Sequence, residues 1–214
     1  MSTIFMCGDP HGRFSHIVDA VLEERPAAVI LLGDLDLQRP LHEELAPIIG
    51  VTDIRWIHGN HETDSELHYD HLFGSRLADR GLHGRVVEVA GLRVAGIGGV
   101  FRGKIWDGQH PRFDSQQSYL RVHGKGNDWR GGLPLRHRSS IFPSDIAGLQ
   151  HLQADILVTH EAPDLHPHGF APLSALARSM GVRAAFHGHH HATIVYPDGV
   201  WRGVALREIF RYRF

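Results

Sequence analysis

Residues 4–12 read Ile-Phe-Met-Cys-Gly-Asp-Pro-His-Gly, a short apolar run that ends in glycine, a carboxylate and an imidazole. Further along the chain, other apolar runs also end in hard oxygen or imidazole ligands. These later segments are Gly33-Asp34-Leu35-Asp36, Gly59-Asn60-His61-Glu62, Thr159-His160-Glu161 and Gly188-His189-His190-His191. One such cluster would carry little information. Five of them, each placed where a strand would end, predict one shared site.

The spacing of the early clusters predicts repeated strand and helix units. We expect buried strands over 3–7, 28–32 and 53–57, with helices over 14–24 and 41–49 between them. Asp9, Asp34 and Asn60 are separated by 25 and 26 residues, close to the ~30 residues of one βαβ unit. The strand at 28–32 is continuously apolar, which is typical of a parallel strand buried on both faces.

The second half of the chain has more strand patterns. We expect a hairpin of 86–89 and 92–97 turned at Ala90-Gly91, strands over 156–159 and 184–187, and a hairpin over 195–200. Helices are expected over 144–152, with Ser144 as N-cap, and over 173–180. The last residues, 207–214, alternate apolar and basic side chains, which favours an exposed or edge strand.

The segment at about 101–142 differs from the rest in its weak periodicity and its charge. It contains three Asp but eight Lys and Arg residues. The eight basic residues are Arg102, Lys104, Arg112, Arg121, Lys125, Arg130, Arg136 and Arg138. We expect it to be a cap-like insertion in one domain spanning 1–214, with Arg102, Arg136 and Arg138 as candidate substrate-binding residues. Two alternatives stay open. The run 136–138 is a solvated face or an anion contact, and Trp106 and Trp129 are packing residues or platforms for a base.

The bulk properties exclude several classes of protein. With 214 residues, 42% hydrophobic and 21% charged, the chain is long enough for a full core. The formal net charge of −2 argues against binding long polyanions through bulk charge, so nucleic acid is not expected as the main partner. Cys7 is the only cysteine, which excludes an intrachain disulfide and a thiolate zinc site. We expect a cytoplasmic protein without membrane contact, because neither a signal peptide nor a long apolar span is evident.

The five clusters offer carboxylate, imidazole and amide oxygen, without sulfur. These ligands suit divalent first-row metals such as Mn, Fe, Ni or Zn, and the many histidines argue against Mg or Ca alone. Two ions held about 3.5–4 Å apart can clamp the attacking and leaving oxygens of a phosphoryl displacement. A shared carboxylate keeps two ions that close, and Asp34 is the natural bridge.

The ordered set GD-x-H, GD, GNH, a lone His after a strand, and GH-x-H resembles the calcineurin-like metallophosphoesterase superfamily. All five elements are present between residues 8 and 191. The resemblance implies an α/β fold in which two mixed β-sheets pack as a sandwich flanked by helices, a four-layer arrangement with the metals at one end. It also implies a binuclear metal-dependent phosphoesterase that hydrolyses its ester by attack of a metal hydroxide.

The resemblance further implies a role for each matching residue. Asp9, His11 and His191 would hold one metal, Asn60, His160 and His189 the other, and Asp34 both. His61 would be the catalytic histidine, which protonates the departing oxygen or steadies charge on the phosphoryl group. Asp36 is a candidate for orienting His61, and His190 should point away. Manganese is the metal we expect, with Fe, Zn and Ni as alternatives.

Two departures from the family's protein serine/threonine phosphatases guide the choice of substrate. Those proteins carry Asp-Arg-Gly after the bridging aspartate and an arginine before Gly-Asn-His-Glu, whereas this chain has Leu35-Asp36-Leu37 and His58. We therefore expect a phosphodiesterase acting on a small anionic or nucleotide phosphoester. The alternatives are a phosphomonoesterase or protein phosphatase, a nuclease, and a non-catalytic interaction scaffold with the same fold.

Overall fold

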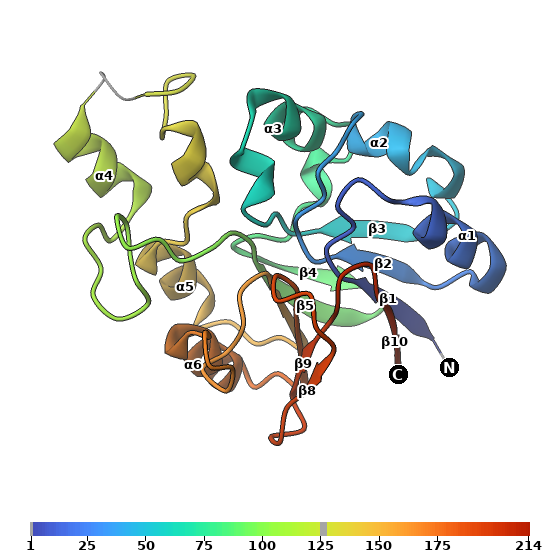
Figure 1. The fold of residues 1–214 in the computed structure, drawn as a ribbon. Helices are drawn as coiled ribbons and strands as arrows, with labels where there is room; N and C mark the ends of the chain where they lie inside the picture. Colours follow the sequence, from blue (N-terminus) through green and yellow to red (C-terminus); the bar gives the residue numbers. More distant parts are fainter. Residues whose placement is uncertain (1, 125–127) are drawn as a thin grey trace.

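The apolar runs form two mixed β-sheets that pack face to face (Figure 1). The computed structural model describes residues 2–124 and 128–214, so Lys125 of the basic segment lies outside the described residues. One sheet has the order β10-β1-β2-β3 and the other β4-β5-β6-β7-β9-β8. The strands are β1 Thr3–Cys7, β2 Ala28–Leu31, β3 Asp53–Trp56, β4 Arg85–Val89, β5 Leu92–Ile97, β6 Ile156–Thr159, β7 Ala184–His187, β8 Ile194–Val195, β9 Trp201–Gly203 and β10 Ile209–Arg213.

Helices cover the outer face of each sheet (Figure 1). The α-helices are α1 Ser15–Glu24, α2 Leu41–Glu44, α3 Glu66–Phe73, α4 Gln116–His123, α5 Pro143–Leu149 and α6 Ala171–Met180. Short 3₁₀ helices are η1 Ala46–Ile48, η2 His61–Thr63, η3 Ala78–Arg80 and η5 Leu135–Ser139. Among the described helices, none is long and apolar enough to cross a membrane.

Alternation along the strands explains the layers. In β1, Ile4 and Met6 belong to the buried cluster between the two sheets, while Phe5 and Cys7 belong to the cluster under α1 and α2. The outer face of the six-stranded sheet packs on α5 and α6. Burying a side chain such as Ile4 contributes about 1.5–3 kcal/mol. The order helix, sheet, sheet, helix confirms the predicted four-layer α/β fold.

Parallel pairing brings the five polar segments together. β1, β2 and β3 are parallel, with Cys7 opposite Leu31 and Leu31 opposite Trp56. β5, β6 and β7 are also parallel, with Thr159 opposite His187. Each polar segment follows the carboxyl end of one of these strands, so all five lie at the same edge of the sandwich.

Several local predictions need correction. The helix expected over 41–49 is broken into α2 and η1, because Pro47 lacks the N–H that a continuous α-helix needs. Ser144 is not an N-cap, since α5 starts at Pro143 and the Asp145 carboxylate accepts the N–H of the true N-cap, Phe142. The turn at Ala90-Gly91 is confirmed, and both residues have positive φ.

The terminal strand and the late hairpin follow the sequence pattern. β10 lies at the edge of the four-stranded sheet, antiparallel to β1. Phe210 and Tyr212 face the core between the sheets, whereas Arg211 pairs with Glu24 of α1. In the late hairpin, β8 pairs with β9, and the two strands extend beyond both ends of the expected range 195–200.

The insertion at 101–142 contains structure that the sequence analysis missed. Helix α4 begins after Ser115, whose hydroxyl accepts the N–H of Ser118. Trp106 and Tyr119 belong to the same buried cluster as the outer face of the six-stranded sheet, so Trp106 is a packing residue. In Figure 1 the insertion stands on the far side of the molecule from α1.

Candidate metal centre

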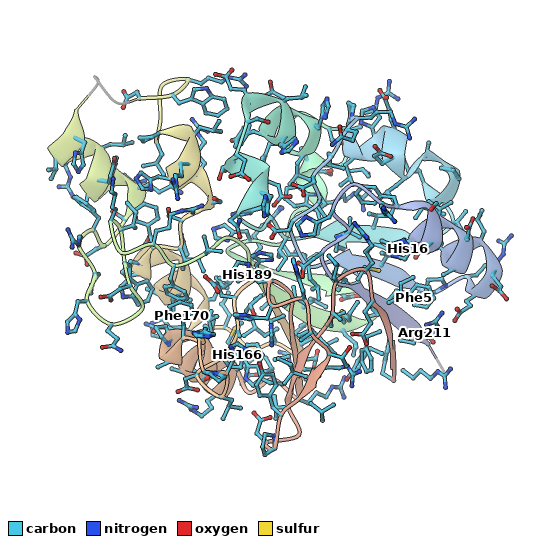
Figure 2. All side chains as sticks on the ribbon, in the orientation of Figure 1. Phe5, His16, His166, Phe170, His189 and Arg211 are labelled. Atoms are coloured by element: carbon cyan, nitrogen blue, oxygen red, sulfur yellow. The ribbon has the colours of Figure 1, made fainter. Side chains whose placement is uncertain are left out.

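Two groups of side chains at this edge share one carboxylate. His11, Asp34 and His191 each offer a ligand atom, and these atoms lie within 4.8 Å of one another. Asp34, His160 and His189 form a second such group. Because Asp34 belongs to both, the arrangement fits two ions joined by a bridging carboxylate. In Figure 2, His189 lies near the centre of the view, between the insertion and the α1 side.

Asp9 and Asn60 complete the two groups. Asp9 Oδ2 accepts the backbone N–H of His189 at 2.8 Å and lies 4.0 Å from Nε2 of His191. Asn60 follows β3, and its backbone N–H donates to Asp34 Oδ1 at 2.9 Å. The seven residues predicted as metal ligands therefore lie together.

Unpaired polar atoms show that these residues fit metal ions. Within the described residues, the buried atoms without a hydrogen-bond partner include Asp9 Oδ1, Asn60 Oδ1, His160 Nε2 and His189 Nδ1. His160 Nδ1 lies 2.8 Å from the Leu32 carbonyl oxygen and donates to it, which leaves Nε2 as the free lone pair. An unsatisfied buried polar atom costs ~1–3 kcal/mol, and a cation at this place would remove that cost.

The electrostatics of the metal-free site point the same way. Burial raises the pKa of Asp9 to about 6. Burial also acts to raise the pKa of Asp34, but the positive charge of His160, whose Nε2 lies 3.3 Å from Asp34 Oδ2, holds it below its usual range. In return, Asp34 and Asp9 raise the pKa of His160 to about 10 against the opposing effect of burial. The buried carboxylates thus attract a proton to His160, and metal binding would release it.

The ligand residues have an unusual backbone. Asp9, His11, Asp34, His189 and His191 all have positive φ, between 36° and 67°. This left-handed region costs a non-glycine residue about 1–3 kcal/mol, and such strain is typical of functional sites. Gly59 allows the segments to approach, because a Cβ there would collide with Asp34 Oδ1. The strained backbone therefore lowers the stability of the fold while it directs these side chains toward one another.

His61 has a different carboxylate partner from the one predicted. Its Nδ1 lies 2.7 Å from Asp64 Oδ2 and 3.7 Å from Asp36 Oδ1, so Asp64 is the hydrogen-bond acceptor. The 3₁₀ turn η2 explains this, because side chains at positions i and i+3 eclipse in such a turn. The pair His61-x-x-Asp64 was visible in the sequence and was missed.

Asp36 contacts a metal ligand instead. Its Oδ2 lies 2.5 Å from His11 Nδ1, which leaves His11 Nε2 directed toward His191 Nε2 at 3.2 Å. A carboxylate behind a ligating histidine fixes the ring's tautomer and orientation. The shorter contact of Asp36 is therefore with His11, and we expect it to orient that ring; a role toward His61, from 3.7 Å, stays a prediction.

These contacts predict different effects for two conservative variants. We expect Asp64→Asn to lower kcat ~10–100-fold, the usual range for losing such a partner, with unchanged KM and metal content. Asp36→Asn should instead weaken metal binding, seen as a higher metal concentration needed for half-maximal activity. The measurements are steady-state kinetics and a metal titration for each variant. Loss of metal by Asp64→Asn would contradict this assignment.

Glu62 is a second residue that the sequence analysis left without a role. Its two carboxylate oxygens accept the backbone N–H groups of Leu35 and Gly59, at 2.6 and 2.5 Å. It therefore ties the segment around Asp34 to the segment around Asn60. Burial raises the pKa of Glu62 to about 7, and the charge of Asp34 acts in the same direction.

The three candidate substrate-binding arginines differ in position. Arg102 Nη1 donates to the Ser139 carbonyl at 3.0 Å, and burial, together with Arg136, lowers its pKa to about 10. Arg136 is exposed. Arg138 is used inside the protein, because it donates to Leu133 O, Tyr69 Oη and Trp129 O.

Glu161 lies between the backbone of Phe101, which precedes Arg102, and the ligand group of His189. Glu161 Oε1 accepts the N–H of Phe101, and its Oε2 lies 3.8 Å from His189 Nε2. Of the arginines, Arg102 is thus the one joined by neighbouring contacts to a ligand residue.

The remaining histidines of the last segment have other surroundings. His190 packs its ring against His166 at 3.9 Å between centroids and belongs to neither ligand group, although its ring lies 5.2 Å from that of His189. His187 is buried, with Nε2 2.8 Å from Tyr196 Oη. Figure 2 labels His166 below His189.

Comparisons with known proteins show the family and the fold of this chain. The family model described as calcineurin-like phosphoesterase matches residues 2–193, which include all five polar segments. An uncharacterized protein of Haemophilus influenzae is 46% identical over 194 residues, covering 90% of this chain and 85% of that protein. The crystal structure of TT1561 of Thermus thermophilus shares the fold at 13% identity, with a TM-score of 0.58 and coverage of 99% and 98% of the two chains. A dimetal phosphatase from Danio rerio is 16% identical with a TM-score of 0.49, covering 97% of this chain and 88% of that chain.

Proposed function

Because this chain belongs to the calcineurin-like phosphoesterase family and is a metal-dependent phosphoric ester hydrolase, we propose that it is a phosphodiesterase for a small anionic or nucleotide phosphoester. The observation that carries this choice is His58, which precedes Gly59. Its ring is buried, and burial lowers its pKa well below the usual value, so it is neutral. A terminal phosphate monoester carries more negative charge than a diester, and a neutral ring at this position offers that charge no partner.

The proposed division of labour follows the contacts at the site. Asp9, His11 and His191 would hold one divalent ion, Asn60, His160 and His189 the other, and Asp34 both. Bound there, the ions would supply Lewis-acid stabilisation of phosphoryl charge and lower the pKa of water. The protein's part is to hold the ligands with Glu62, Asp36 and strained backbone, and to exclude other geometries.

His61 is the residue that we propose to act on the leaving oxygen. Its Nδ1–H donates to Asp64, and its Nε2 lies 3.8 Å from Asp34 Oδ2, on the side of the ligands. The ring is 39% exposed, so it can meet a substrate. Burial acts to lower its pKa, but Asp34, Asp36 and Asp64 together raise it, which favours the protonated, proton-donating form.

Further parts of the proposal concern the surroundings of the site. We propose that the insertion at 101–142 forms a cap, with Arg102 as the cation that meets the substrate's negative charge. We also propose that manganese is the native metal and that the protein is cytoplasmic. The net charge of −2 favours a small phosphoester over nucleic acid as the substrate.

The test compares two model substrates. Protein loaded with Mn²⁺ should hydrolyse bis-p-nitrophenyl phosphate with a higher kcat/KM than p-nitrophenyl phosphate, measured as release of p-nitrophenolate. Asp34→Ala serves as the blank, and its rate is subtracted because it measures hydrolysis by contaminating phosphatases. A clear preference for the monoester would replace the phosphodiesterase proposal with a phosphomonoesterase.

A further inference from the structure

A pocket separate from the metal centre lies in the segment 101–142, between α4 and η5. Its volume is about 490 Å³, within the range of small-molecule sites. It is lined by Lys104, Arg112, Phe113, Tyr119, Val122, His123 and His137. None of these residues belongs to either group of metal-ligand side chains. In Figure 1, α4 is the helix at the upper left.

One wall of this pocket is built of rings. Tyr119 and His123 lie 4.3 Å apart between centroids, with an interplanar angle of 31°. Phe113 contacts Tyr119 edge-on at 5.0 Å, and the ring of His137 lies 5.3 Å from Tyr119. Such a wall can pack against a planar aromatic ring, as aromatic side chains do when they stack on bases.

The pocket also carries positive charge without a partner. Within the described residues, Lys104 and Arg112 form no salt bridge, and no carboxylate lines the pocket. Arg130 of the same segment is different, because it pairs with Asp70 and Glu66. Burial lowers the pKa of His137 to about 4, and Arg102, Lys104 and Arg136 act in the same direction. Cations gathered without carboxylates favour an anion as ligand.

Helix η5 contacts both sites: one of its residues lines the pocket, and another contacts the segment that carries His61. His137 lines the pocket, while Ser139 Oγ lies 2.6 Å from Thr63 Oγ1, two residues after His61. Arg102 donates to Ser139 on the same helix. A ligand in the pocket therefore lies behind the helix that supports the segment carrying His61.

We propose that the pocket between α4 and η5 binds a planar aromatic ring that carries an anionic group, as in a nucleoside monophosphate. This chemistry has two sources, the non-reacting end of a long substrate or a separate ligand. The first source rests on the proposed function, whereas binding of the ring and anion does not. Lys104 and Arg112 hold the anion, and the exposed ring of His123, backed by the buried ring of Tyr119, packs against the ligand's ring.

The test uses the full-length, metal-loaded protein and a phosphonate analogue of AMP, in which a methylene group replaces the ester oxygen and blocks hydrolysis. Isothermal titration compares it with adenosine, which lacks the anion, and with methylphosphonate, which lacks the ring. We expect the analogue to bind more tightly than either. The double variant Lys104→Ala/Arg112→Ala should weaken it at least ~10-fold, because two charge-assisted contacts are lost.

Arg121→Ala is the matched control, since Arg121 is an exposed cation on α4 that does not line the pocket. It should bind the analogue as the unmodified protein does. Equal affinity of the unmodified protein and the double variant would overturn the proposal. Hydrolysis of bis-p-nitrophenyl phosphate is measured separately, so failure of the proposed function is seen independently.

The same assay distinguishes the two sources. Competitive inhibition by the analogue, weakened in the double variant, identifies the pocket as the far end of the substrate site. Binding without competition identifies a separate ligand. Both results support a site for a ring and an anion.

Discussion

Replacing Asp34 with alanine should lower hydrolysis of phosphoesters at least ~10³-fold, because Lewis-acid stabilisation by a metal is worth several kcal/mol and each 1.36 kcal/mol is tenfold in rate. Asp34 is the carboxylate shared by both ligand groups. Its Oδ1 also accepts the backbone N–H groups of Asn60 and His61, at 2.9 and 3.0 Å. The substitution would thus remove the proposed bridge and two hydrogen bonds to the segment that carries His61, the proposed catalytic histidine.

Metal analysis separates this result from simple unfolding. Elemental analysis of the purified variant should find at most one ion per chain, against about two in the unmodified protein. Asp19→Ala, which removes an exposed carboxylate on α1, is the control and should keep both activity and metal. An Asp34→Ala protein that retained two ions and full activity would contradict a bridging role.

Replacing His61 with alanine should lower kcat ~10²–10⁴-fold, the usual contribution of a positioned general acid. Metal content should stay unchanged, because His61 belongs to neither ligand group. The ring's Nε2 faces the ligand Asp34 while Asp64 holds its Nδ1, so the substitution removes a proton donor without removing a ligand. Steady-state kinetics and metal analysis of the same preparation check both expectations.

The leaving group shows what His61 does. An ester of phenol, a poor leaving group, needs a proton more than an ester of p-nitrophenol, so His61→Ala should slow the phenyl ester more. Equal loss on both esters would contradict proton donation and favour stabilisation of phosphoryl charge. His110→Ala is the control, because its side chain is 86% exposed and lies outside the ligand groups.

The gathering of the proposed metal ligands at one place was predictable because it depends on a simple rule of sheet topology. Asp9, Asp34, Asn60 and His160 follow apolar strands, and parallel strands place their carboxyl ends at one edge. The choice of Asp34 as the bridge also followed from its middle place among the clusters, and it is the residue that both ligand groups share.

Loop details were less predictable. Asp36 was expected to orient His61, but the turn η2 brings Asp64 closer to that ring, and the shorter contact of Asp36 is with His11. Helix α4 was missed because its pattern is weak and its capping Ser115 lies in a polar stretch. The break at Pro47 is a local signal that the apolar pattern of 41–49 concealed.

The sequence by itself indicated the strand and helix units, the order of the polar segments and the residue types that can bind metal, because apolar runs, alternation and ligand chemistry are properties of neighbouring residues. The four-layer arrangement was expected from the resemblance of the ordered motifs to the family. Only the tertiary structure decided which carboxylate contacts which histidine, as Asp36 does His11 and Asp64 does His61. It also decided that Asp9, His11 and Asp34 adopt positive φ. Both depend on contacts between segments far apart in the chain, such as Glu62 with Leu35, whose packing fixes loop positions to within a hydrogen-bond length.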